Sequence, residues 1–357
     1  MDAVSLFSGA GGMDLGFHQA GFNTIQACEM NADACQTFRD NGLGPIFEGD
    51  VRNLLPSLTQ GMADIVFGGP PCQGISVAGK MDPTDPRTQL IDTFLDAVEA
   101  VRPTAFVMEN VDALLALAKW RPKLDAIKAR AMSMGYGLHC MIANSADYGV
   151  PQSRRRFFAV GVKDRSDASV EESVSDGMFR RRTDPVSSGT VFKALGPQGS
   201  AMNPATSRAS ITFSKNPVMR RTAYAGMLFN GAGRPIDPAR PAPTMTASAG
   251  GNKTHMVDEE QVFGSGKSFS EAYHQHLLEG GTPGAMKIPA SLRRLTAAES
   301  AAFQGFPKGF TFHGRNSSVY RQIGNAVPVG LAAAVAGTVH DTLSGLAWLG
   351  ASSNVAA

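Results

Sequence analysis

The cysteine at position 72 stands in surroundings that suit a reaction better than packing. It belongs to the run Gly68-Gly-Pro-Pro-Cys72-Gln-Gly74, which directly follows the apolar strand candidate 63–67. The prolines stiffen the approach to the thiol and the glycines leave it room, whereas a structural cysteine is normally buried among apolar neighbours. Because a thiol reacts as its thiolate, which polar or electropositive surroundings favour, the run indicates a nucleophilic cysteine at a strand end.

A zinc-dependent nucleobase deaminase also carries a Pro-Cys element and is the first alternative. That chemistry needs Pro-Cys-x-x-Cys together with His-x-Glu. Here Ile75 stands at the third place after Cys72, and none of the seven histidines precedes a glutamate by two positions. The sequence therefore predicts no metal site, and the zinc interpretation is rejected.

A carboxylate and two arginines could act on the same substrate ring as the thiol. Glu109 leaves the strand candidate 105–108 in the run Glu-Asn-Val. A glutamate there can hydrogen bond to a ring nitrogen or protonate it. Arg154 and Arg156 alternate as at the start of a strand, so both are expected to point to one face. Each of these features alone would more often be structural than catalytic.

A glycine turn near the N-terminus is a candidate cofactor site. The run Phe7-Ser-Gly9-Ala-Gly11-Gly12 lies between an apolar strand candidate and the helical segment 13–20. Such a turn lets a nucleotide-like ligand approach the backbone, and Glu29, at the end of the next strand candidate, can bind ribose hydroxyls. A dinucleotide fingerprint would have glycine where Asp14 stands, so an adenosine-containing ligand without a pyrophosphate fits better. A purely structural tight turn is the alternative.

The segments around these motifs alternate between strand and helix. Strand candidates are 24–28, 63–67, 105–108, 138–143 and 157–160, and helix candidates are 13–20, 32–39 and 124–134. This alternation predicts an α/β fold with a doubly wound, mostly parallel sheet and helices on both faces. Ligands bind such sheets at the carboxyl ends of the strands, so the glycine turn, Glu29, Cys72 and Glu109 are expected to meet at one edge.

The alternation stops near Lys163, which predicts a second, smaller domain. Residues 164–176 are rich in Ser, Asp and Glu and are expected to be a linker, and 177–285 have no regular period. Helices are expected at 292–306 and at 327–343, the latter with Pro328 near its first turn. The expected domains are therefore 1–163, a loop-rich substrate domain at 164–285, and a return segment at 286–357 that completes the first domain.

The composition indicates an ordinary globular protein. Of 357 residues, 43% are apolar and 18% are charged, and the four cysteines form no C-x-x-C pair, which suits a reducing compartment. No signal peptide or membrane-length apolar run is evident, so a soluble intracellular protein is expected. The net charge of +2 says little about nucleic acid. Arginine clusters could bind phosphates or bases or form a solvated face; they are Arg154–Arg156, Arg180–Arg182, Arg220–Arg221 and Arg293–Arg294.

The order of the motifs resembles that of the DNA (cytosine-5)-methyltransferase family, in its bacterial restriction-modification or orphan form. The matching runs are Phe-x-Gly-x-Gly-Gly, an acidic strand end, Pro-Cys-Gln, Glu-Asn-Val, Gln-x-Arg-x-Arg and Gly-Asn-x-Val. The resemblance covers residues 3–162 and 286–343, and six matches in one order form a specific signature. It implies the fold of S-adenosylmethionine-dependent methyltransferases with a variable target-recognition domain and a final helix that returns to the start.

The resemblance also implies a reaction. A methyl group would pass from S-adenosylmethionine to C5 of a cytosine flipped out of a specific double-stranded DNA sequence, through a covalent bond between Cys72 and C6. It implies a cytoplasmic, nucleoid-associated monomer, with a restriction endonuclease as its functional partner and no membrane association. The segment 73–87 would close over the DNA, with a passive surface loop as the alternative.

Carried over residue by residue, the resemblance implies three sets of functional residues. The catalytic set is Cys72, Glu109, Arg154 and Arg156. The S-adenosylmethionine set is Phe7, Gly9, Gly11, Gly12, Glu29, Asp50, Pro71, Leu90 and Asn325. DNA contacts are implied for Gln73, Ser76, Arg87, Gln152, Thr244 and Met245.

Two positions depart from the family pattern, and three other functions were weighed. Ile75 replaces the usual Phe or Trp, and Met30 replaces a frequent aromatic after Glu29, which weakens loop packing and adenine stacking. A related tRNA methyltransferase would usually have a short middle region and a Cys-Phe-Thr element, and neither is found. An NAD-dependent oxidoreductase is disfavoured by Asp14. A non-catalytic DNA-binding regulator would not need the full catalytic set.

Overall fold

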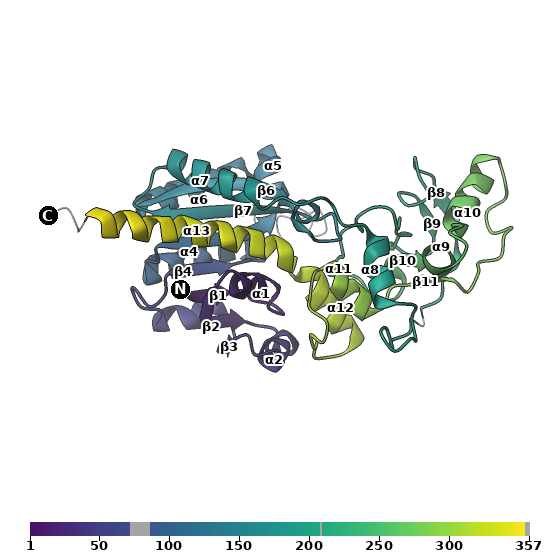
Figure 1. The fold of residues 1–357 in the computed structure, drawn as a ribbon, viewed down its shortest axis with the longest axis horizontal. Coiled ribbons are helices and arrows are strands. Elements are labelled where there is room, and N and C mark those ends of the chain that lie inside the picture. The colour runs from purple at the N-terminus through teal and green to yellow at the C-terminus, as the bar shows by residue number, and fades with distance from the viewer. Residues whose placement is uncertain (72–85, 208, 354–357) are drawn as a thin grey trace. The chain divides into compact units, whose positions relative to one another are not determined.

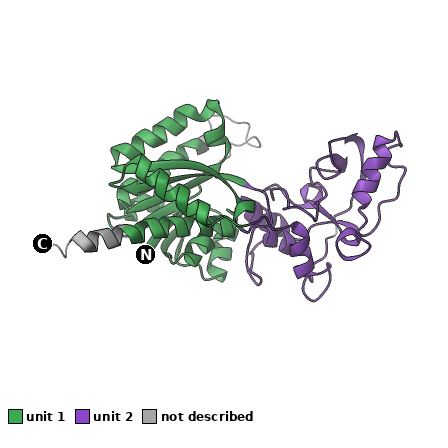
Figure 2. Cartoon of the chain, turned by 45° about the horizontal axis from the view of Figure 1, so that its top comes forward, with its two compact units in different colours: residues 1–148, 155–183, 327–357 green, residues 149–154, 184–326 purple. Residues whose placement is uncertain are grey.

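The computed structural model describes residues 1–71, 86–207 and 209–353. The chain forms two compact units, coloured separately in Figure 2. Unit 1 comprises residues 1–148, 155–183 and 327–357, and unit 2 comprises residues 149–154 and 184–326.

Among the described residues of unit 1, a seven-stranded sheet has the order β3-β2-β1-β4-β5-β7-β6. All neighbouring strands run parallel except β7, which is antiparallel to both β5 and β6. This confirms the predicted doubly wound, mostly parallel sheet. The strands are β1 (Asp2–Leu6), β2 (Asn23–Glu29), β3 (Ile46–Glu48), β4 (Ile65–Gly68), β5 (Ala105–Val111), β6 (Tyr136–Asn144) and β7 (Arg155–Lys163).

Helices cover both faces of this sheet and form two apolar cores. One core contains buried residues of α1 (Gly12–Gln19), α7 (Asp167–Arg180) and α13 (Val329–Ser353), which lie along the same face (Figure 1). The other contains residues of α3 (Val51–Leu54), α4 (Leu90–Val101), α5 (Ala113–Ala116) and α6 (Arg121–Ser133). Helix α2 (Ala32–Asp40) follows β2, and short 3₁₀ turns are η1 (Leu55–Ser57), η3 (Pro86–Gln89), η4 (Ala118–Trp120) and η5 (Ser145–Tyr148).

The linker predicted at 164–176 is wrong, because the segment forms helix α7. Ser166 caps the helix by accepting a hydrogen bond from the backbone N–H of Ser169 at 3.3 Å. Val170, Val174 and Met178 recur at the spacing of four residues that places them on one helix face, and all three are buried. Residues 164–183 therefore belong to unit 1.

Helix α13 is longer than the predicted 327–343. The stretch 316–345 is long and apolar enough to cross a membrane, but 72% of its most apolar window is buried inside the protein. Leu331, Val335 and Val339 are almost fully enclosed. Burial against the sheet thus accounts for the apolar character of this helix.

Unit 2 is built from short elements, with two small antiparallel ladders, β8–β9 and β10–β11, in its described part. Its strands are β8 (Phe213–Val218), β9 (Met227–Phe229), β10 (Met256–Asp258) and β11 (Leu292–Arg294). Its helices are α8 (Ser188–Leu195), η6 (Gly251–Lys253), α9 (Glu259–Phe263), α10 (Phe269–Leu278), α11 (Ala297–Phe303) and α12 (Asn316–Asn325).

The helix predicted at 292–306 is wrong in its first half. Residues 292–294 form strand β11, and α11 begins only after Thr296, whose side chain forms a reciprocal capping box with Glu299. Because 286–326 lie in unit 2, the compact units change at 183/184 and 326/327 rather than at the predicted 163/164 and 285/286. A target-recognition role for the second unit stays a prediction.

Candidate active site

The glycine turn between β1 and α1 has the conformation that its sequence predicts. Phe7, Gly9 and Gly11 all have positive φ, at 57°, 55° and 84°. A Cβ on Gly11 would lie 2.1 Å from Cδ1 of Leu43, so only glycine fits, whereas a Cβ on Gly9 would meet nothing within 4 Å. The turn therefore packs closely against Leu43 at Gly11, whereas at Gly9 there is space for a ligand to approach the backbone.

Two acidic residues stand at the carboxyl ends of β2 and β3, beside this turn. Oε2 of Glu29 accepts a hydrogen bond from Gly9 N at 3.0 Å, and Oε1 accepts one from Asn31 N at 2.8 Å. Asp50 caps α3 by accepting from Arg52 N at 2.9 Å, and the Arg52 side chain lowers the pKa of this carboxyl. Both side chains thus place carboxyl oxygens beside the turn, where they can accept hydrogen bonds from a ligand.

The other predicted cofactor residues are distributed over both units. Gly12 opens α1, Leu90 opens α4 and is half-buried, and Pro71 lies just after β4. Asn325 is exposed at the end of α12, in unit 2. Membership of all these residues in one cofactor site stays a prediction.

Glu109 and Arg156 form an ion pair at the ends of β5 and β7. Nε of Arg156 lies 2.9 Å from Oε1 of Glu109, and the two side chains are only 15% and 12% exposed. The pair forms because β7 is antiparallel to β5 and so begins where β5 ends. A Cβ on Gly69 would lie 2.8 Å from Oε2 of Glu109, so this glycine makes room for the carboxylate.

Asn110 anchors the chain that enters the cysteine motif, and sequence analysis missed this role. Its side chain is fully buried, and Nδ2 donates a hydrogen bond to Pro70 O at 3.1 Å. The sequence feature that could have indicated this role is an amide side chain at the end of the apolar strand segment 105–108, directly after Glu109. Cys72, Gln73 and Ser76 lie outside the described residues, as do the side chain of Arg87 and most of the predicted closing segment 73–87.

The other three cysteines have no reactive character. Cys28 and Cys35 are almost fully buried, and burial raises the pKa of each thiol to about 12. Burial likewise raises the pKa of Cys140 to about 11. A thiol whose pKa is raised is rarely a thiolate at neutral pH, so none of the three competes with Cys72 as a nucleophile.

Arg154 and Arg156 bind different partners, and whether they share one face stays a prediction. Strand β7 begins at Arg155, and Arg154 belongs to unit 2, where it is 3% exposed. Its guanidinium donates to Met245 O and to Gly324 O, both at 2.7 Å. The described contacts of Arg154 are therefore structural.

Gln152 and Met245 are also buried inside unit 2, which contradicts the direct DNA contacts predicted for them. The Gln152 amide donates to Phe303 O at 3.0 Å and accepts from Met245 N at 2.7 Å. Gln152 is fully enclosed and Met245 is 2% exposed. Thr244 is less buried, and its hydroxyl donates to Ser153 O at 3.0 Å. These contacts join the segment 149–154 to the rest of unit 2.

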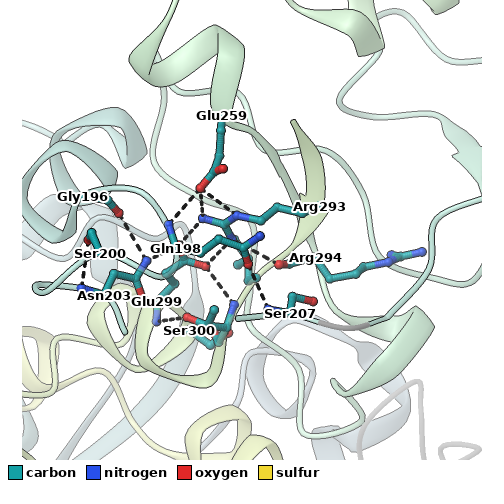
Figure 3. Close-up of polar contacts among 12 residues, drawn as sticks. Gly196, Gln198, Ser200, Asn203, Ser207, Glu259, Arg293, Arg294, Glu299 and Ser300 are labelled. Atoms are coloured by element: carbon teal, nitrogen blue, oxygen red, sulfur yellow. Dashed lines mark hydrogen bonds and ion pairs between the residues drawn. The ribbon is translucent and has the colours of Figure 1, made fainter. Parts of the chain in front are cut away.

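The arginine clusters differ in how far they are buried. Arg293 is bound by Glu299 and Glu259 in the interior of unit 2, and Arg294 is likewise enclosed (Figure 3). Arg180, Arg181 and Arg182 form ion pairs with Asp176, Asp341 and Asp147. Arg220 and Arg221 are exposed, as are Arg180 and Arg182. Within the described part of the chain, no group of three or more metal-ligating side chains gathers.

The sheet with one reversed strand and the acidic groups at its carboxyl edge define a doubly wound α/β enzyme. The model of the C-5 cytosine-specific DNA methylase family matches residues 1–341, and the chain belongs to this family. It is accordingly a DNA (cytosine-5)-methyltransferase, as its sequence predicted.

Relatives of known type agree with this assignment, and a solved structure shares the fold. The Type II methyltransferase M1.HphI of Haemophilus parahaemolyticus is 31% identical, covering 94% of this chain and 86% of the relative. The Type II methyltransferase M.NgoPII of Neisseria gonorrhoeae is 31% identical, covering 96% of each chain. The Dnmt2 methyltransferase of S. pombe has the same fold, with a TM-score of 0.63 at 16% identity over 97% of this chain and 99% of that one.

Proposed function

We propose that this enzyme transfers the methyl group of S-adenosylmethionine to C5 of a cytosine flipped out of double-stranded DNA, while Cys72 is bonded to C6. The observation that carries the proposal is the Glu109–Arg156 pair beside Gly69, three residues before Cys72. A partly buried ion pair at the carboxyl edge of the sheet offers both hydrogen-bond acceptors and donors to a ring.

The glycine turn suits the adenosine part of the cofactor. Its backbone is open at Gly9, and the carboxylate of Glu29 is held beside it with lone pairs that ribose hydroxyls can use. Asp50 offers a second acceptor at the end of β3, where the adenine amino group would bind. When bound, the cofactor supplies an electrophilic methyl group on a sulfonium. The chain itself supplies the binding groups and no electrophile.

The cysteine and Glu109 act together to make C5 of cytosine nucleophilic. The Cys72 thiolate adds to C6 and forms a C–S bond, and the ring electrons move toward C5 and N3. Glu109 stabilises or protonates N3 and accepts a hydrogen bond from the exocyclic amine, while Arg156 orients Glu109 and the ring. C5 would then bond to the methyl group as the bond from this group to the cofactor sulfur breaks and its electron pair stays on sulfur. A base removes the C5 proton, the C–S bond to Cys72 breaks, and any proton on N3 returns to Glu109, which restores the aromatic ring.

Two consequences follow for the remaining residues and for the DNA. A paired cytosine within a duplex cannot present its face to Cys72, so the base must leave the stack. Arg154, whose guanidinium is engaged by two carbonyls, acts as a positioning residue and not as a catalytic one.

The enzyme acts as a monomer on DNA in the cytoplasm, and its similarity to Type II methyltransferases supports a restriction endonuclease as functional partner.

Labelled methyl transfer to mixed-sequence duplex DNA tests the proposal. Wild-type protein should place the label in 5-methylcytosine, and Cys72→Ser should place none. A duplex with 5-fluorocytosine at the target should give a denaturation-resistant complex that needs both S-adenosylmethionine and Cys72, because fluorine cannot leave as the proton does. Transfer to RNA but not DNA, or transfer by Cys72→Ser at the wild-type rate, would contradict the proposal.

A further inference from the structure

Charge is unevenly distributed along unit 2. Residues 185–257 contain eight basic residues and a single acidic one, Asp237. The next segment, 258–279, contains five acidic residues and only Lys267 as a base. The last segment of unit 2, residues 280–326, is again basic, with six basic residues and only Glu299 as an acid. Because DNA is a polyanion, its phosphates would be attracted to these two basic segments, and the first of them contains a hairpin.

Within the basic segment lies the β8–β9 hairpin, residues 213–229. Its strands pair antiparallel, with Phe213 opposite Phe229 and Val218 opposite Met227. The two phenylalanines pack against α10. The ring centroids of Phe213 and of Tyr273 in α10 are 4.4 Å apart, and Tyr273 is fully buried. Figure 1 shows β8, β9 and α10 side by side. An aromatic cluster therefore supports one face of the hairpin.

The open end of the hairpin is fixed by Asn230 and Arg294. Asn230 N donates to Thr212 O at 2.8 Å, and its Oδ1 accepts from Thr212 N at 3.0 Å. Nη2 of Arg294 donates to both Asn230 O and Asn230 Oδ1, at 2.6 and 2.9 Å, and Arg294 is 1% exposed. A Cβ on Gly233 would lie 2.6 Å from Nη1 of Arg294, so this glycine lets the guanidinium in.

The connecting loop of the hairpin is fixed as well. The imidazole Nε2 of His274 donates to Arg220 O at 2.9 Å, which orients the loop backbone. The Tyr224 hydroxyl accepts from Nε2 of Gln261 at 2.8 Å. Both ends of the hairpin are thus held by buried or half-buried groups, so its exposed side chains project from a rigid support.

Those exposed side chains are of the types that read DNA. Lys215, Asn216, Arg220 and Arg221 are all exposed. The cross-strand pair Val218 and Met227 is 39% and 41% exposed, although both residues are apolar. Lysine and asparagine bind base edges, arginine binds phosphates or guanine, and apolar side chains contact the methyl group of thymine.

We infer that the β8–β9 hairpin reads the target sequence: it enters the major groove, where Lys215 and Asn216 contact base edges and Arg220 and Arg221 contact phosphates. This inference rests on the proposed function, because it takes duplex DNA as the substrate. The groove admits a two-stranded ribbon, and the exposed Val218–Met227 pair lies on the same ribbon against the base edges.

Selection of bound duplexes from a random-sequence pool tests the inference without needing catalysis. The double variant Lys215→Ala/Asn216→Ala should lose at least about fivefold in discrimination at one or two positions of the selected site. Arg220→Ala/Arg221→Ala should keep the same preferred sequence but bind more weakly. The slope of its log affinity against log salt should fall by about two.

The matched control is Lys128→Ala/Lys287→Ala, which removes two exposed positive charges outside the hairpin and should leave the selected sequence unchanged. Unfolding temperatures equal to the wild type's would show that all variants fold. Wild-type preference retained by Lys215→Ala/Asn216→Ala, or no selected sequence with wild type, would overturn the inference. Selection without methylation by wild type would instead refute the proposed function, and the hairpin variants would still decide this inference.

Discussion

Two arginine–carboxylate pairs in this protein have similar contact distances but different neighbours. In unit 1, Glu109 and Arg156 are 2.9 Å apart and keep 12% and 15% of their side-chain surface exposed. In unit 2, Glu299 and Arg293 are 2.6 Å apart, and their side chains are 0% and 5% exposed. The distance between the charges does not tell the two pairs apart.

The neighbours of the two carboxylates do distinguish them. Besides Arg293, Glu299 accepts hydrogen bonds from Asn203 Nδ2 at 2.9 Å and Thr296 N at 2.8 Å, all within unit 2 (Figure 3). Glu109 instead stands at a strand end beside Gly69, where the chain leads to Cys72. Under the proposed function, access and the neighbouring nucleophile mark Glu109–Arg156 as a chemical pair, whereas complete burial marks Glu299–Arg293 as a structural one.

Glu109→Gln should have the largest effect on the reaction. It keeps the size of the side chain but removes its charge and its ability to protonate N3, so methyl transfer should fall by about 10²–10⁴-fold. Binding of S-adenosylmethionine, measured by calorimetry, should change less than about twofold, because Glu109 is not among the predicted cofactor residues. If the rate of methyl transfer stayed within tenfold of wild type, Glu109 would have a structural role, as Glu299 does, and not a catalytic one.

Glu299→Gln should lower the stability of the protein and leave its methyl-transfer activity nearly unchanged. Removing one member of a buried pair leaves Arg293 without its main countercharge and should cost about 3–5 kcal/mol of unfolding free energy. Denaturant titration measures this, and Glu48→Gln in the exposed Arg39–Glu48 pair is the control, with an expected change below about 1 kcal/mol. Methyl transfer per folded molecule should stay near wild type. A large loss of methyl transfer at unchanged stability would show that the two pairs do not differ in role.

Gly69→Ala should move Glu109 without changing any functional group. The added methyl would lie 2.8 Å from Oε2 of Glu109, so the carboxylate must shift. A displacement of about 1 Å in a reacting group can cost about 10²-fold, so turnover should fall by about ten- to a hundredfold. Normal turnover in a folded Gly69→Ala protein would show that the carboxylate position is not critical.

A third buried carboxylate, Asp14, shows the behaviour expected of a carboxyl group with no cation beside it. Burial raises its pKa to about 7, with hydrogen bonds from Ser5 and Thr24 opposing the shift. His18 also contacts Thr24, and burial lowers its pKa. Asp14 therefore stabilises the fold fully below its unfolded pKa near 3.8, and this stability is lost as pH rises toward 7.

The expected slope of unfolding free energy from Asp14 is at most about 1.4 kcal/mol per pH unit. Urea titrations between pH 4 and 7 should show stability falling less steeply with pH in Asp14→Asn than in wild type. The His18 contribution has the opposite sign and cancels in this difference. Equal slopes in the two proteins would mean that Asp14 ionises normally.

The sequence predicted well those features that depend on local pattern. The glycine turn, the acidic ends of β2 and β5 and the alternation of strands with helices all follow from short runs of residues. Helix α7 was missed because the Ser, Asp and Glu residues on its exposed face outnumber the buried apolar side chains Val170, Val174 and Met178.

Features that depend on distant segments could not be predicted. Arg154 and Arg156 are two positions apart, yet Arg154 binds carbonyls of Met245 and Gly324, 91 and 170 residues along the chain. Nothing in the local run around Arg154 indicates that its guanidinium would be used inside unit 2. The same holds for Arg294, whose partners Asn230 and Thr254 lie far away in sequence.

The position of α13 in the chain determines when the protein can finish folding. The face of the sheet that carries Phe17 and Val174 needs Leu331 and Val335 to complete its core. A ribosome that has just made residue 183 must add all of unit 2, at about 5–20 residues per second, before α13 emerges. For on the order of ten seconds, one apolar face of every nascent molecule is therefore open to solvent and to chaperones.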